Sequence, residues 1–258
     1  MISKLANIHP DAKIGKNVTI DSFTTIYEDV EIGEGTTIGP NVTIYQGARI
    51  GKNCNIFPGA VISAVPQDLK FHGEYTTTEI GDNTSIRECV TIHRGTDDRK
   101  KTKIGSNCLL MCYVHIAHDT FLGDNVIVAN NTNIAGHVTI GDWAIVEGMV
   151  GIQQFVSIGE HAFVAGMTSV RKDVPPFIRV AREPLSYAGV NSIGLRRRGM
   201  EDQTIKEIEN LYRLLFVLNS SVSKGVKQIE SELDQTDLVN NITDFIKKSE
   251  KGIIKGLI

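Results

Sequence analysis

The sequence predicts an all-β parallel β-helix over residues 1–176, followed by a connecting loop and an α-helical domain over residues 177–258. Three observations predict this class. Aliphatic residues repeat every six positions in the first part, aromatic residues make up only 6% of the chain while glycines number 24, and apolar residues beyond residue 200 recur at helical spacing. Many small residues and few large rings suit a core built from a regular array of branched side chains.

The six-residue repeat is the strongest of these signals. From Ile8 every sixth residue up to Ile62 is isoleucine, and the same register resumes at Ile80 and again at Ile104, from where it reaches Val170. A helix needs a period near 3.6 and a simple strand a period of 2, so neither explains the pattern. A hexapeptide repeat is typical of a parallel β-helix, in which the aliphatic residue points inward.

The pattern resembles that of the hexapeptide-repeat family of left-handed β-helices. The left hand is implied by the resemblance alone, because parallel crossovers are otherwise right-handed. In this family three hexads make one triangular coil, so equivalent places three hexads apart in this sequence should stack in columns. Successive coils should lie about 4.8 Å apart, the usual spacing of paired strands.

Two segments interrupt the register. Residues 63–79 put Asp68 and Glu74 in positions where aliphatic residues belong, and residues 96–103 put Asp98 in another. Both segments should leave the prism as loops. They are either tolerated surface insertions or functional loops, since a rigid scaffold often carries its functional residues on projecting loops.

The hexads stop after Pro175 and Pro176, and residues 177–199 have the character of a loop. Beyond it, apolar residues from Ile205 to Leu215 recur at helical spacing, which predicts amphipathic helices. A helical domain at this position should cover the open end of the solenoid.

Composition and charge exclude several classes of protein. The net charge of −3 gives no general attraction to nucleic acid. The segment MISKLANIHP lacks the apolar region of a signal peptide, and no apolar run is long enough to span a membrane. The four cysteines fit no zinc or redox spacing, so we expect reduced thiols and a cytoplasmic location.

Residues three hexads apart should stack in one column, and this stacking brings candidate catalytic groups together. His118, Gly136 and Gln154 should stack in one column, and Asp119 and His137 should stack in the next. These columns follow the inward aliphatic residue by two and three places, so they should not point into the core. A satisfied histidine of the hydrophobic core is therefore not expected at position 118.

The same histidines could in principle bind a metal. However, Cys112 and His118 lie one hexad apart, on different faces of the prism, so they cannot meet within one subunit. A trimer could bring different edges together, as in the β-helical carbonic anhydrases, but the histidine spacing of those enzymes is absent here, so no metal is expected. A general base is the better hypothesis for His118, because neutral imidazole is abundant near pH 7 and can take a proton from an alcohol. Gly136 beside it leaves a backbone N–H approachable, as an oxyanion donor must be.

Five motifs make the resemblance more specific, and they closely resemble those of the UDP-N-acetylglucosamine O-acyltransferase family: QDLKF (67–71), IRECVTIHRGT (86–96), LLMCYVHIAHD (109–119), AGHVTIGD (135–142) and GVNSIGLRRRG (189–199). The resemblance covers the whole chain. It implies the first reaction of lipid A synthesis, in which an (R)-3-hydroxyacyl group passes from acyl carrier protein to the glucosamine 3-hydroxyl of UDP-N-acetylglucosamine. It also implies a homotrimer with active sites between subunits, and no cofactor.

The resemblance assigns roles to individual residues. His118 matches the general base, Asp119 its partner, and Gly136 the oxyanion donor. Substrate-binding positions of the family match Gln67, Lys70, His93, His115, His137, Gln154, Asn191, Arg197 and Arg198. The chain departs from the family pattern at Ile193, where an acidic residue is expected, and this affects uridine recognition.

Two further features concern the donor. Basic residues outnumber acidic ones between residues 171 and 198, which favours an acidic carrier protein and the diphosphate of the nucleotide. Gly148 and Gly166 occupy the same place in successive coils, so they should leave a channel free of side chains. The resemblance places the end of the acyl chain near Gly166, and we expect a chain of about 14 carbons or more to bury its methylenes there.

Two alternatives remain at this point. An N-acyltransferase of the same superfamily would usually carry an additional N-terminal domain, whereas the hexads here begin at residue 8. A non-catalytic β-helical scaffold would not need His118, Gly136 and Gln154 in one column beside a cluster of arginines.

Overall fold

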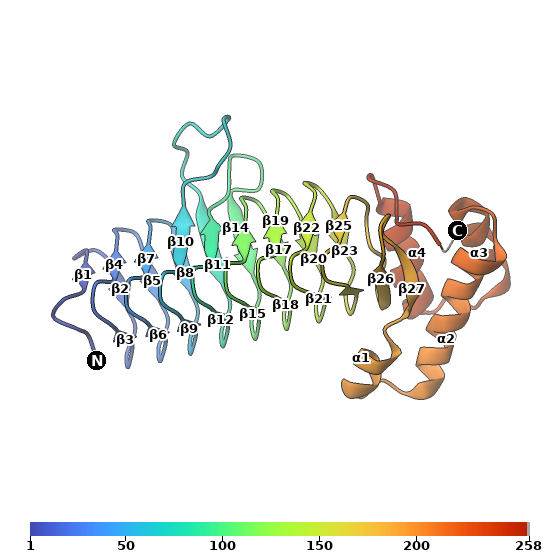
Figure 1. Cartoon of the computed structure of the whole chain (residues 1–258), viewed down its shortest axis with the longest axis horizontal. Coiled ribbons are helices and arrows are strands. Elements are labelled where there is room, and N and C mark those ends of the chain that lie inside the picture. Colours follow the sequence, from blue (N-terminus) through green and yellow to red (C-terminus); the bar gives the residue numbers. More distant parts are fainter. Residues whose placement is uncertain (257–258) are drawn as a thin grey trace.

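Each hexad forms one short strand and one turn, and three hexads complete one coil of a triangular prism (Figure 1). The structure, a computed structural model, describes residues 1–256. Three parallel sheets form the faces of the prism, as the repeat predicts.

The first sheet has nine strands: β1 (Asn7–Ile8), β4 (Thr25–Ile26), β7 (Thr43–Ile44), β10 (Val61–Ala64), β13 (Thr91–His93), β16 (His115–Ile116), β19 (Asn133–Ile134), β22 (Gly151–Ile152) and β25 (Ser169–Val170). The second has eight: β2 (Lys13–Ile14), β5 (Glu31–Ile32), β8 (Ala48–Ile50), β11 (Thr77–Ile80), β14 (Lys101–Ile104), β17 (Phe121–Leu122), β20 (Thr139–Ile140) and β23 (Ser157–Ile158).

The third sheet has ten strands: β3 (Thr19–Ile20), β6 (Thr37–Ile38), β9 (Asn55–Ile56), β12 (Ser85–Ile86), β15 (Leu109–Leu110), β18 (Ile127–Val128), β21 (Ile145–Val146), β24 (Phe163–Val164), β26 (Ile178–Ala181) and β27 (Ser186–Val190). Strand β26 pairs in parallel with β24, and β27 returns antiparallel to it. The sheet therefore extends past residue 176 into the segment expected to be a loop, because Ile178 and Val180 alternate with exposed residues and continue the buried face.

Strand pairing follows the predicted columns. Ile116 pairs with Ile134, and Ile134 with Ile152. Around the two interruptions the partners lie further apart in the sequence, since Ile62 pairs with Ile92, and Ile92 with Ile116. The first interruption therefore lengthens its coil by two hexads and the second by one hexad. Because both insertions are whole hexads, the aliphatic register is kept.

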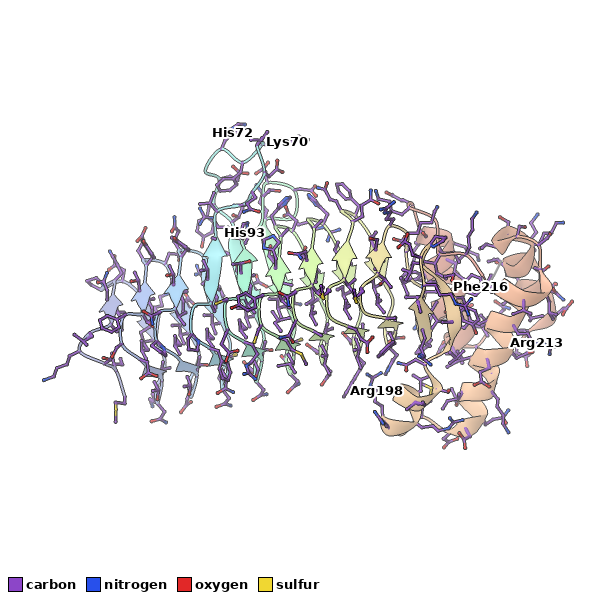
Figure 2. The ribbon with its side chains drawn as sticks, viewed as in Figure 1. Lys70, His72, His93, Arg198, Arg213 and Phe216 are labelled. Carbon is purple, nitrogen blue, oxygen red and sulfur yellow. The ribbon has the colours of Figure 1, made fainter. Side chains whose placement is uncertain are left out.

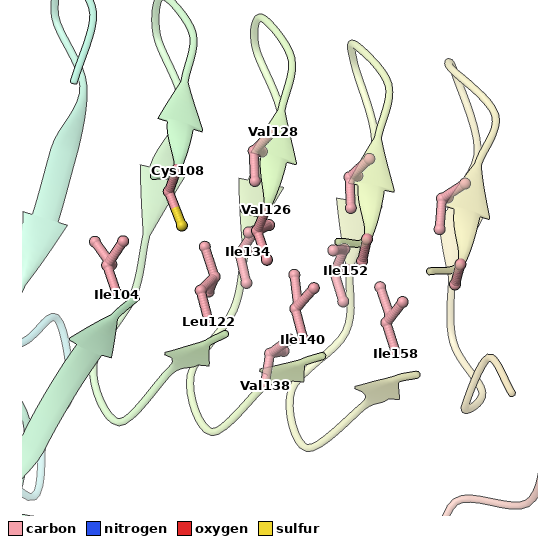
Figure 3. Close-up of a cluster of buried hydrophobic side chains, with 14 of the residues drawn as sticks. Ile104, Cys108, Leu122, Val126, Val128, Ile134, Val138, Ile140, Ile152 and Ile158 are labelled. Atoms are coloured by element: carbon pink, nitrogen blue, oxygen red, sulfur yellow. The ribbon is translucent and has the colours of Figure 1, made fainter. Parts of the chain in front are cut away.

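The core is the stack of inward aliphatic side chains. Figure 3 shows Ile104, Leu122, Ile140 and Ile158 aligned along the inside of the prism, and each is at most 2% exposed. Burying such a side chain contributes roughly 1.5–3 kcal/mol to folding. The repeat of this contact in every coil is what holds the prism together.

The corners require an unusual backbone conformation. The residue three places after the inward aliphatic residue has a positive φ in nearly every coil, for example 58° at Asn17 and 62° at His137. Asparagine tolerates this region, whereas a ring such as that of His137 or Phe155 (φ 67°) enters it at a cost of about 1–2 kcal/mol.

Both interruptions leave the same corner of the prism as neighbouring loops (Figure 1). The first joins β10 to β11 through residues 65–76, and Lys70 and His72 lie near its outer end (Figure 2). The second joins β13 to β14 through residues 94–100. The loops touch, since the Arg94 guanidinium lies over the Phe71 ring, 5.4 Å from its centroid.

Helices cover the C-terminal end of the prism: α1 (Ser192–Arg197), α2 (Asp202–Arg213), the π-helical turn η1 (Leu214–Leu218), α3 (Val222–Glu232) and α4 (Asp237–Lys248). Tyr212 of α2 is fully buried and donates a hydrogen bond to the Pro176 carbonyl at 2.6 Å, which joins the helices to the prism. Within residues 1–256, no helix is both long and apolar enough to cross a membrane.

The contribution of one inward isoleucine can be measured. Ile44 is fully buried between neighbouring coils, whereas Ile8 in the same sheet is only partly buried in the first coil. We expect Ile44→Ala to lower the free energy of unfolding by about 2–5 kcal/mol, through lost burial and the cavity left behind. Ile8→Ala should cost clearly less in the same denaturant titration. Equal losses would mean that coil stacking is not the main stabilising contact.

Candidate active site

A groove of about 790 Å³ runs along the first sheet beside the first loop. Outward residues after β16, β19, β22 and β25 line its floor, and Gln67, Asp68 and Lys70 of the first loop line its wall. Of the nine expected substrate-binding residues, four line the groove: Gln67, Lys70, His115 and Gln154. The expected catalytic residues His118 and Gly136 line it as well.

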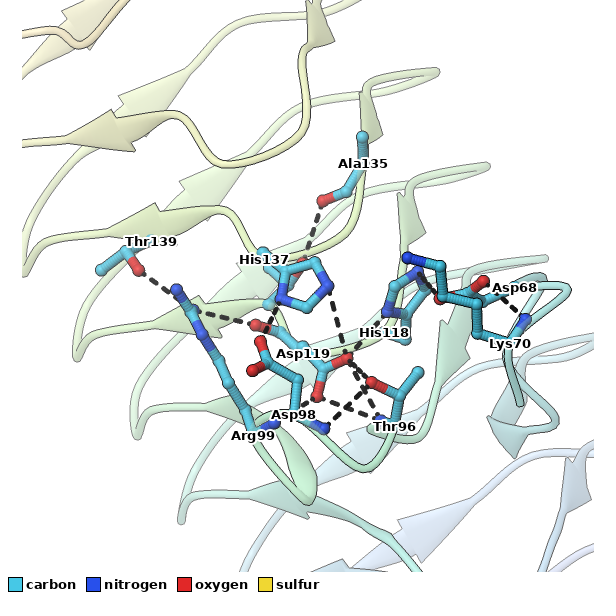
Figure 4. A network of polar contacts seen from close by, with 11 residues as sticks. Asp68, Lys70, Thr96, Asp98, Arg99, His118, Asp119, Ala135, His137 and Thr139 are labelled. Carbon is cyan, nitrogen blue, oxygen red and sulfur yellow. Dashed lines mark hydrogen bonds and ion pairs between the residues drawn. The ribbon is translucent and has the colours of Figure 1, made fainter. Parts of the chain in front are cut away.

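His118 and Asp119 form a buried pair at this groove (Figure 4). The Nδ1 atom of His118 lies 2.8 Å from Asp119 Oδ2. A carboxylate accepts only, so Nδ1 carries the proton and Nε2 is left with a free lone pair. Nε2 lies on the groove side, 4.0 Å from Asp68 Oδ2.

Asp119 is held as an anion by donors from the second loop. The Thr96 hydroxyl donates to it at 2.6 Å, and the backbone N–H groups of Thr96 and Arg99 donate at 3.0 and 3.1 Å. Burial raises the pKa of Asp119, but the hydrogen bonds from His118 and Thr96 outweigh it and bring the pKa down to about 2. The carboxylate therefore stays charged at any physiological pH and fixes the His118 ring.

Gly136 must lack a side chain because the His118 ring occupies that space. A Cβ atom at Gly136 would come within 2.7 Å of His118 Cε1 and 2.8 Å of Nε2. The ring therefore lies directly against the Gly136 backbone, as the stacking of the column predicts. None of the hydrogen bonds described for residues 1–256 uses the Gly136 N–H, which leaves it available to a ligand.

His137 forms the other side of the site. Its ring meets that of His118 edge-on at 5.1 Å between centroids, and it stacks on Phe155 at 4.6 Å. Its Nδ1 lies 2.9 Å from Asp98 Oδ2, although the contact is too poorly aligned to count as a hydrogen bond. Burial lowers the pKa of His137, and the Asp119 carboxylate opposes part of that effect.

His115 lies in the same coil as His118, and His93 lies in the preceding coil. His93 is buried and does not line the groove, and its ring is edge-on to that of His115 at 4.9 Å between centroids. Burial, helped by His115 and His118, lowers the pKa of His93 to about 4, and burial also lowers that of His115. Both rings are therefore neutral near pH 7, and the Thr91 hydroxyl contacts His115 Nδ1 at 2.8 Å.

His118, Asp119 and His137 could be taken for a metal site, because one ligand atom from each lies within 4.8 Å of the others. However, Asp119 already accepts hydrogen bonds from four donors, and one of these is the His118 ring itself. The side-chain atoms that could bind a metal are thus hydrogen-bonded within the site instead of pointing at one common position.

Asn191 and Arg198 gather at a different corner, near the helices, with Arg197 exposed beside them. The Asn191 amide donates to the His161 carbonyl at 3.0 Å, and an Arg198 nitrogen lies 3.1 Å from His161 Nδ1. Burial and the Arg198 charge lower the pKa of His161 to about 4, so its ring is neutral. Within one chain this cluster does not join the groove.

Gly148 and Gly166 stack as expected, but they also lie outside the groove of the single chain. A Cβ atom at Gly166 would lie 3.1 Å from the Gly148 carbonyl oxygen. The column is not entirely open, because the Glu147 carboxylate accepts a hydrogen bond from the Gly166 N–H at 2.9 Å.

Three residues that complete the site, Asp68, Thr96 and Arg99, had no role predicted from the sequence. Asp68 faces His118, while Thr96 and Arg99 hold Asp119. One signal was present, since Asp68 occupies an aliphatic place in the register. A charged residue in such a place indicates a loop, but only the structure indicates where that loop lies.

Comparison with protein families agrees with this geometry. The model described as UDP N-acetylglucosamine O-acyltransferase, domain 2, matches residues 173–254. The bacterial transferase hexapeptide model matches residues 11–46, 29–64 and 101–136.

Individual relatives agree over nearly the full length. The acyl-[acyl-carrier-protein]–UDP-N-acetylglucosamine O-acyltransferase of Sulfurihydrogenibium sp. (strain YO3AOP1) is 53% identical over 256 residues, covering 96% of this chain and 94% of that protein. The enzyme of the same name from Aquifex aeolicus (strain VF5) is 50% identical over 198 residues, 76% of each chain.

Solved structures give the same result. The UDP-N-acetylglucosamine acyltransferase of Bacteroides fragilis 9343 superposes with a TM-score of 0.96 at 47% identity, covering 99% of this chain and 100% of that one. The Arabidopsis enzyme gives 0.82 at 32% identity, with coverage of 99% and 100%. The predicted left-handed parallel β-helix with C-terminal helices is thereby confirmed. The chain belongs to the UDP-N-acetylglucosamine O-acyltransferase family.

Proposed function

We propose that this enzyme transfers an (R)-3-hydroxyacyl group from acyl carrier protein to the 3-hydroxyl of UDP-N-acetylglucosamine, the first step of lipid A biosynthesis, with His118 as general base. The His118–Asp119 pair supports His118 as the base. His118 Nδ1 lies 2.8 Å from Asp119 Oδ2, and the His118 ring lies beside Gly136 in the groove. Histidine has two ring nitrogens, and here one is held by a carboxylate while the other faces open space.

The chemistry follows from these positions. His118 Nε2 takes the proton of the sugar hydroxyl as its oxygen attacks the thioester carbonyl. The Gly136 N–H donates to the oxyanion of the tetrahedral intermediate. Collapse of the intermediate breaks the carbon–sulfur bond, and the thiolate of the carrier arm takes the proton back from the imidazolium. Asp119 stays ionised throughout and stabilises that imidazolium, as its low pKa allows.

We assign four groove residues and the neighbouring His137 to substrate binding. Gln67, Lys70, His115, His137 and Gln154 would position the sugar and the donor. His93 would act indirectly, by supporting the His115 ring. Asn191, Arg197 and Arg198 would contact the nucleotide, and since their corner lies apart from the groove, they would serve the site of a neighbouring subunit.

A homotrimer with active sites between subunits would bring these two clusters together. One edge of the prism supports it, because Tyr113, Met149 and Met167 lie in a single column, with Asn131 between the first two, and are 60%, 60% and 79% exposed. Leu69 on the first loop is fully exposed as well. Exposed apolar residues in such a row mark a surface that another protein covers.

We also propose that the enzyme works in the cytoplasm. None of the four cysteines is paired with another in the structure described, and Cys54 and Cys108 are buried. Unpaired cysteines suit a reducing compartment.

A direct assay tests the reaction. Radiolabelled UDP-N-acetylglucosamine is incubated with 3-hydroxyacyl donors carried by acyl carrier protein or by coenzyme A. We expect product with the carrier protein and much less with coenzyme A. The 3-amino analogue of the sugar serves as the competing acceptor, and its preferential use would make the enzyme an N-acyltransferase.

The role of His118 predicts a large effect on turnover. His118→Ala should lower kcat by roughly 10²–10⁴-fold, because it removes the general base, while the KM for UDP-N-acetylglucosamine changes little. Asp119→Asn should also lower kcat, because the amide can donate to Nδ1 and favour the wrong tautomer. A His118→Ala enzyme with nearly normal turnover would remove this residue from the mechanism.

His137→Ala should also lower activity, mainly because the substrate is positioned less well.

The basic segment predicts a salt-dependent encounter with the carrier. Arg171 and Lys172 are exposed at the end of the groove, so their attraction to an acidic protein should weaken as salt rises. Replacing both by Glu should raise the KM for acylated carrier more than the KM for the nucleotide sugar. Steady-state kinetics measure both KM values. If both changed equally, or neither changed, the carrier would not dock on this segment.

The glycine column predicts a limit on acyl length. Gly166→Met should favour shorter chains, because each excluded methylene forfeits about 0.8 kcal/mol, or about fourfold in kcat/KM. Gly166→Ala should shift the preference less, which provides a graded comparison. Competition between donors of different length gives the ratios directly. An unchanged preference in the Met variant would mean that the chain does not end at this column.

A further inference from the structure

Phe155 occupies a corner of the prism whose backbone conformation disfavours a ring. It lies three places after the inward Ile152 and has a φ of 67°. Asparagine, which tolerates this conformation, takes the same place at many other corners, including Asn107, Asn125 and Asn131. The Phe155 ring is also half-exposed, so burial does not account for it. Its contacts do.

The Phe155 ring contacts the active site. It stacks on the His137 ring, with 4.6 Å between the centroids and 19° between the planes. The two residues are neighbours in one column, because Ile134 pairs with Ile152. His137 in turn meets the His118 ring edge-on, with 5.1 Å between the centroids and 88° between the planes (Figure 4). His137 is therefore packed between a ring of the preceding coil and a ring of the following coil.

Packing, rather than hydrogen bonding, orients the His137 ring. Asp98 Oδ2 lies 2.9 Å from Nδ1, but the contact is too poorly aligned for a hydrogen bond. Asp119 Oδ2 lies 3.8 Å from Nε2, which is beyond hydrogen-bond distance. The torsion that turns a histidine ring has broad minima, so such a ring needs a flat surface to hold its plane. The face of Phe155 provides that surface.

Phe155 is itself held from the C-terminal segment. The Lys251 ammonium lies over the Phe155 ring, 5.6 Å from its centroid, at the distance of a cation–π contact. Buried Asp173 fixes the segment that carries this lysine. Its carboxylate accepts from the Ser249 hydroxyl at 2.6 Å, and its N–H donates to the Gly252 carbonyl at 3.0 Å. The Phe155 ring therefore has one neighbour in the active site and another in a fixed segment beyond it.

We propose that Phe155 is a positioning residue for acyl transfer: its ring fixes the plane of His137, and His137 then holds the sugar hydroxyl at His118 Nε2. This inference rests on the proposed function, because it requires an acceptor bound beside both histidines. Phe155 does not line the groove, so it acts through the His137 ring alone. The strained corner is kept because the stack serves the reaction.

Asparagine at this position provides the test. Phe155→Asn removes the stack but supplies the residue type that the corner favours, so the melting temperature should stay equal or rise. The kcat for transfer from acylated carrier to UDP-N-acetylglucosamine should fall about tenfold, since a misplacement of about 1 Å can cost about 10²-fold. Phe155→Tyr keeps a flat ring and should recover most of the lost kcat.

A double-mutant cycle shows whether Phe155 acts through His137. In the His137→Ala background there is no ring to orient, so adding Phe155→Asn should lower kcat by less than about twofold more. A general loss of folded enzyme would instead lower kcat by the same factor in both backgrounds.

Phe23 provides the matched control. It has a φ of 64° at the equivalent place of an N-terminal coil, is 65% exposed and does not line the groove. Phe23→Asn makes the same chemical change in the same backbone conformation and should leave kcat unchanged. If Phe155→Asn lowers the melting temperature, Phe155→Met replaces it in the cycle, because Met149 and Met167 occupy such corners with φ of 60° and 58°.

The stack is also observed without turnover. In the NMR spectrum of enzyme labelled with ¹³C at histidine Cε1, the His137 signal is identified by its absence in His137→Ala. This signal should move in Phe155→Asn, because the ring current of Phe155 is lost, and should move little in Phe155→Tyr.

The results separate the possible failures. Nearly normal kcat in Phe155→Asn, or the same fold loss with and without the His137 ring, would overturn the positioning role even if the wild type transfers normally. Equal losses in Phe155→Asn and Phe155→Tyr, or an unmoved His137 signal, would overturn it as well. Absence of transfer from acylated carrier in the wild type would refute the proposed function itself, whereas the NMR signal would still report the stack.

Discussion

Hydrogen bonds between successive coils are the contact on which the rest of this structure depends. The N–H of His115 donates to the Thr132 carbonyl at 3.0 Å, and that of Ala117 to the Ile134 carbonyl at 3.0 Å. Such bonds cannot be moved by one residue without turning the aliphatic side chains outward. They therefore fix the register, the register fixes the columns, and the columns bring His118 against Gly136.

This dependence explains which parts of the site could be predicted from the sequence. The stacking of His118 on Gly136 and of Asp119 beside His137 follows from counting residues, because every regular coil obeys the same period. The partners of Asp119 could not be found in this way. Thr96 and Arg99 belong to the second insertion, one hexad long, and no periodic rule determines the conformation of an inserted loop.

The same limit applies at the C-terminal end. Residues 178–190 form strands although the hexads have stopped, because the sheet edge at β24 offers unpaired backbone groups that the chain can use. Sequence periodicity detects side chains that repeat, and it misses strands whose position is determined by an exposed edge. The cavity lined by Leu185, Ser186 and Ile254 depends on this pairing, so it too is a feature of the tertiary structure rather than of the repeat.

The fixed coil spacing has a consequence for how such a protein can change. Side chains in one column occur once per coil, so positions along the groove are available only in steps of about 4.8 Å. An extended hydrocarbon chain advances about 1.2 Å per bond, so one step corresponds to about four carbons. Moving a blocking residue from one coil to the next would change the accommodated length by about four carbons at once. Adjustment by a single carbon must come from the size of one side chain, because the backbone offers no intermediate position.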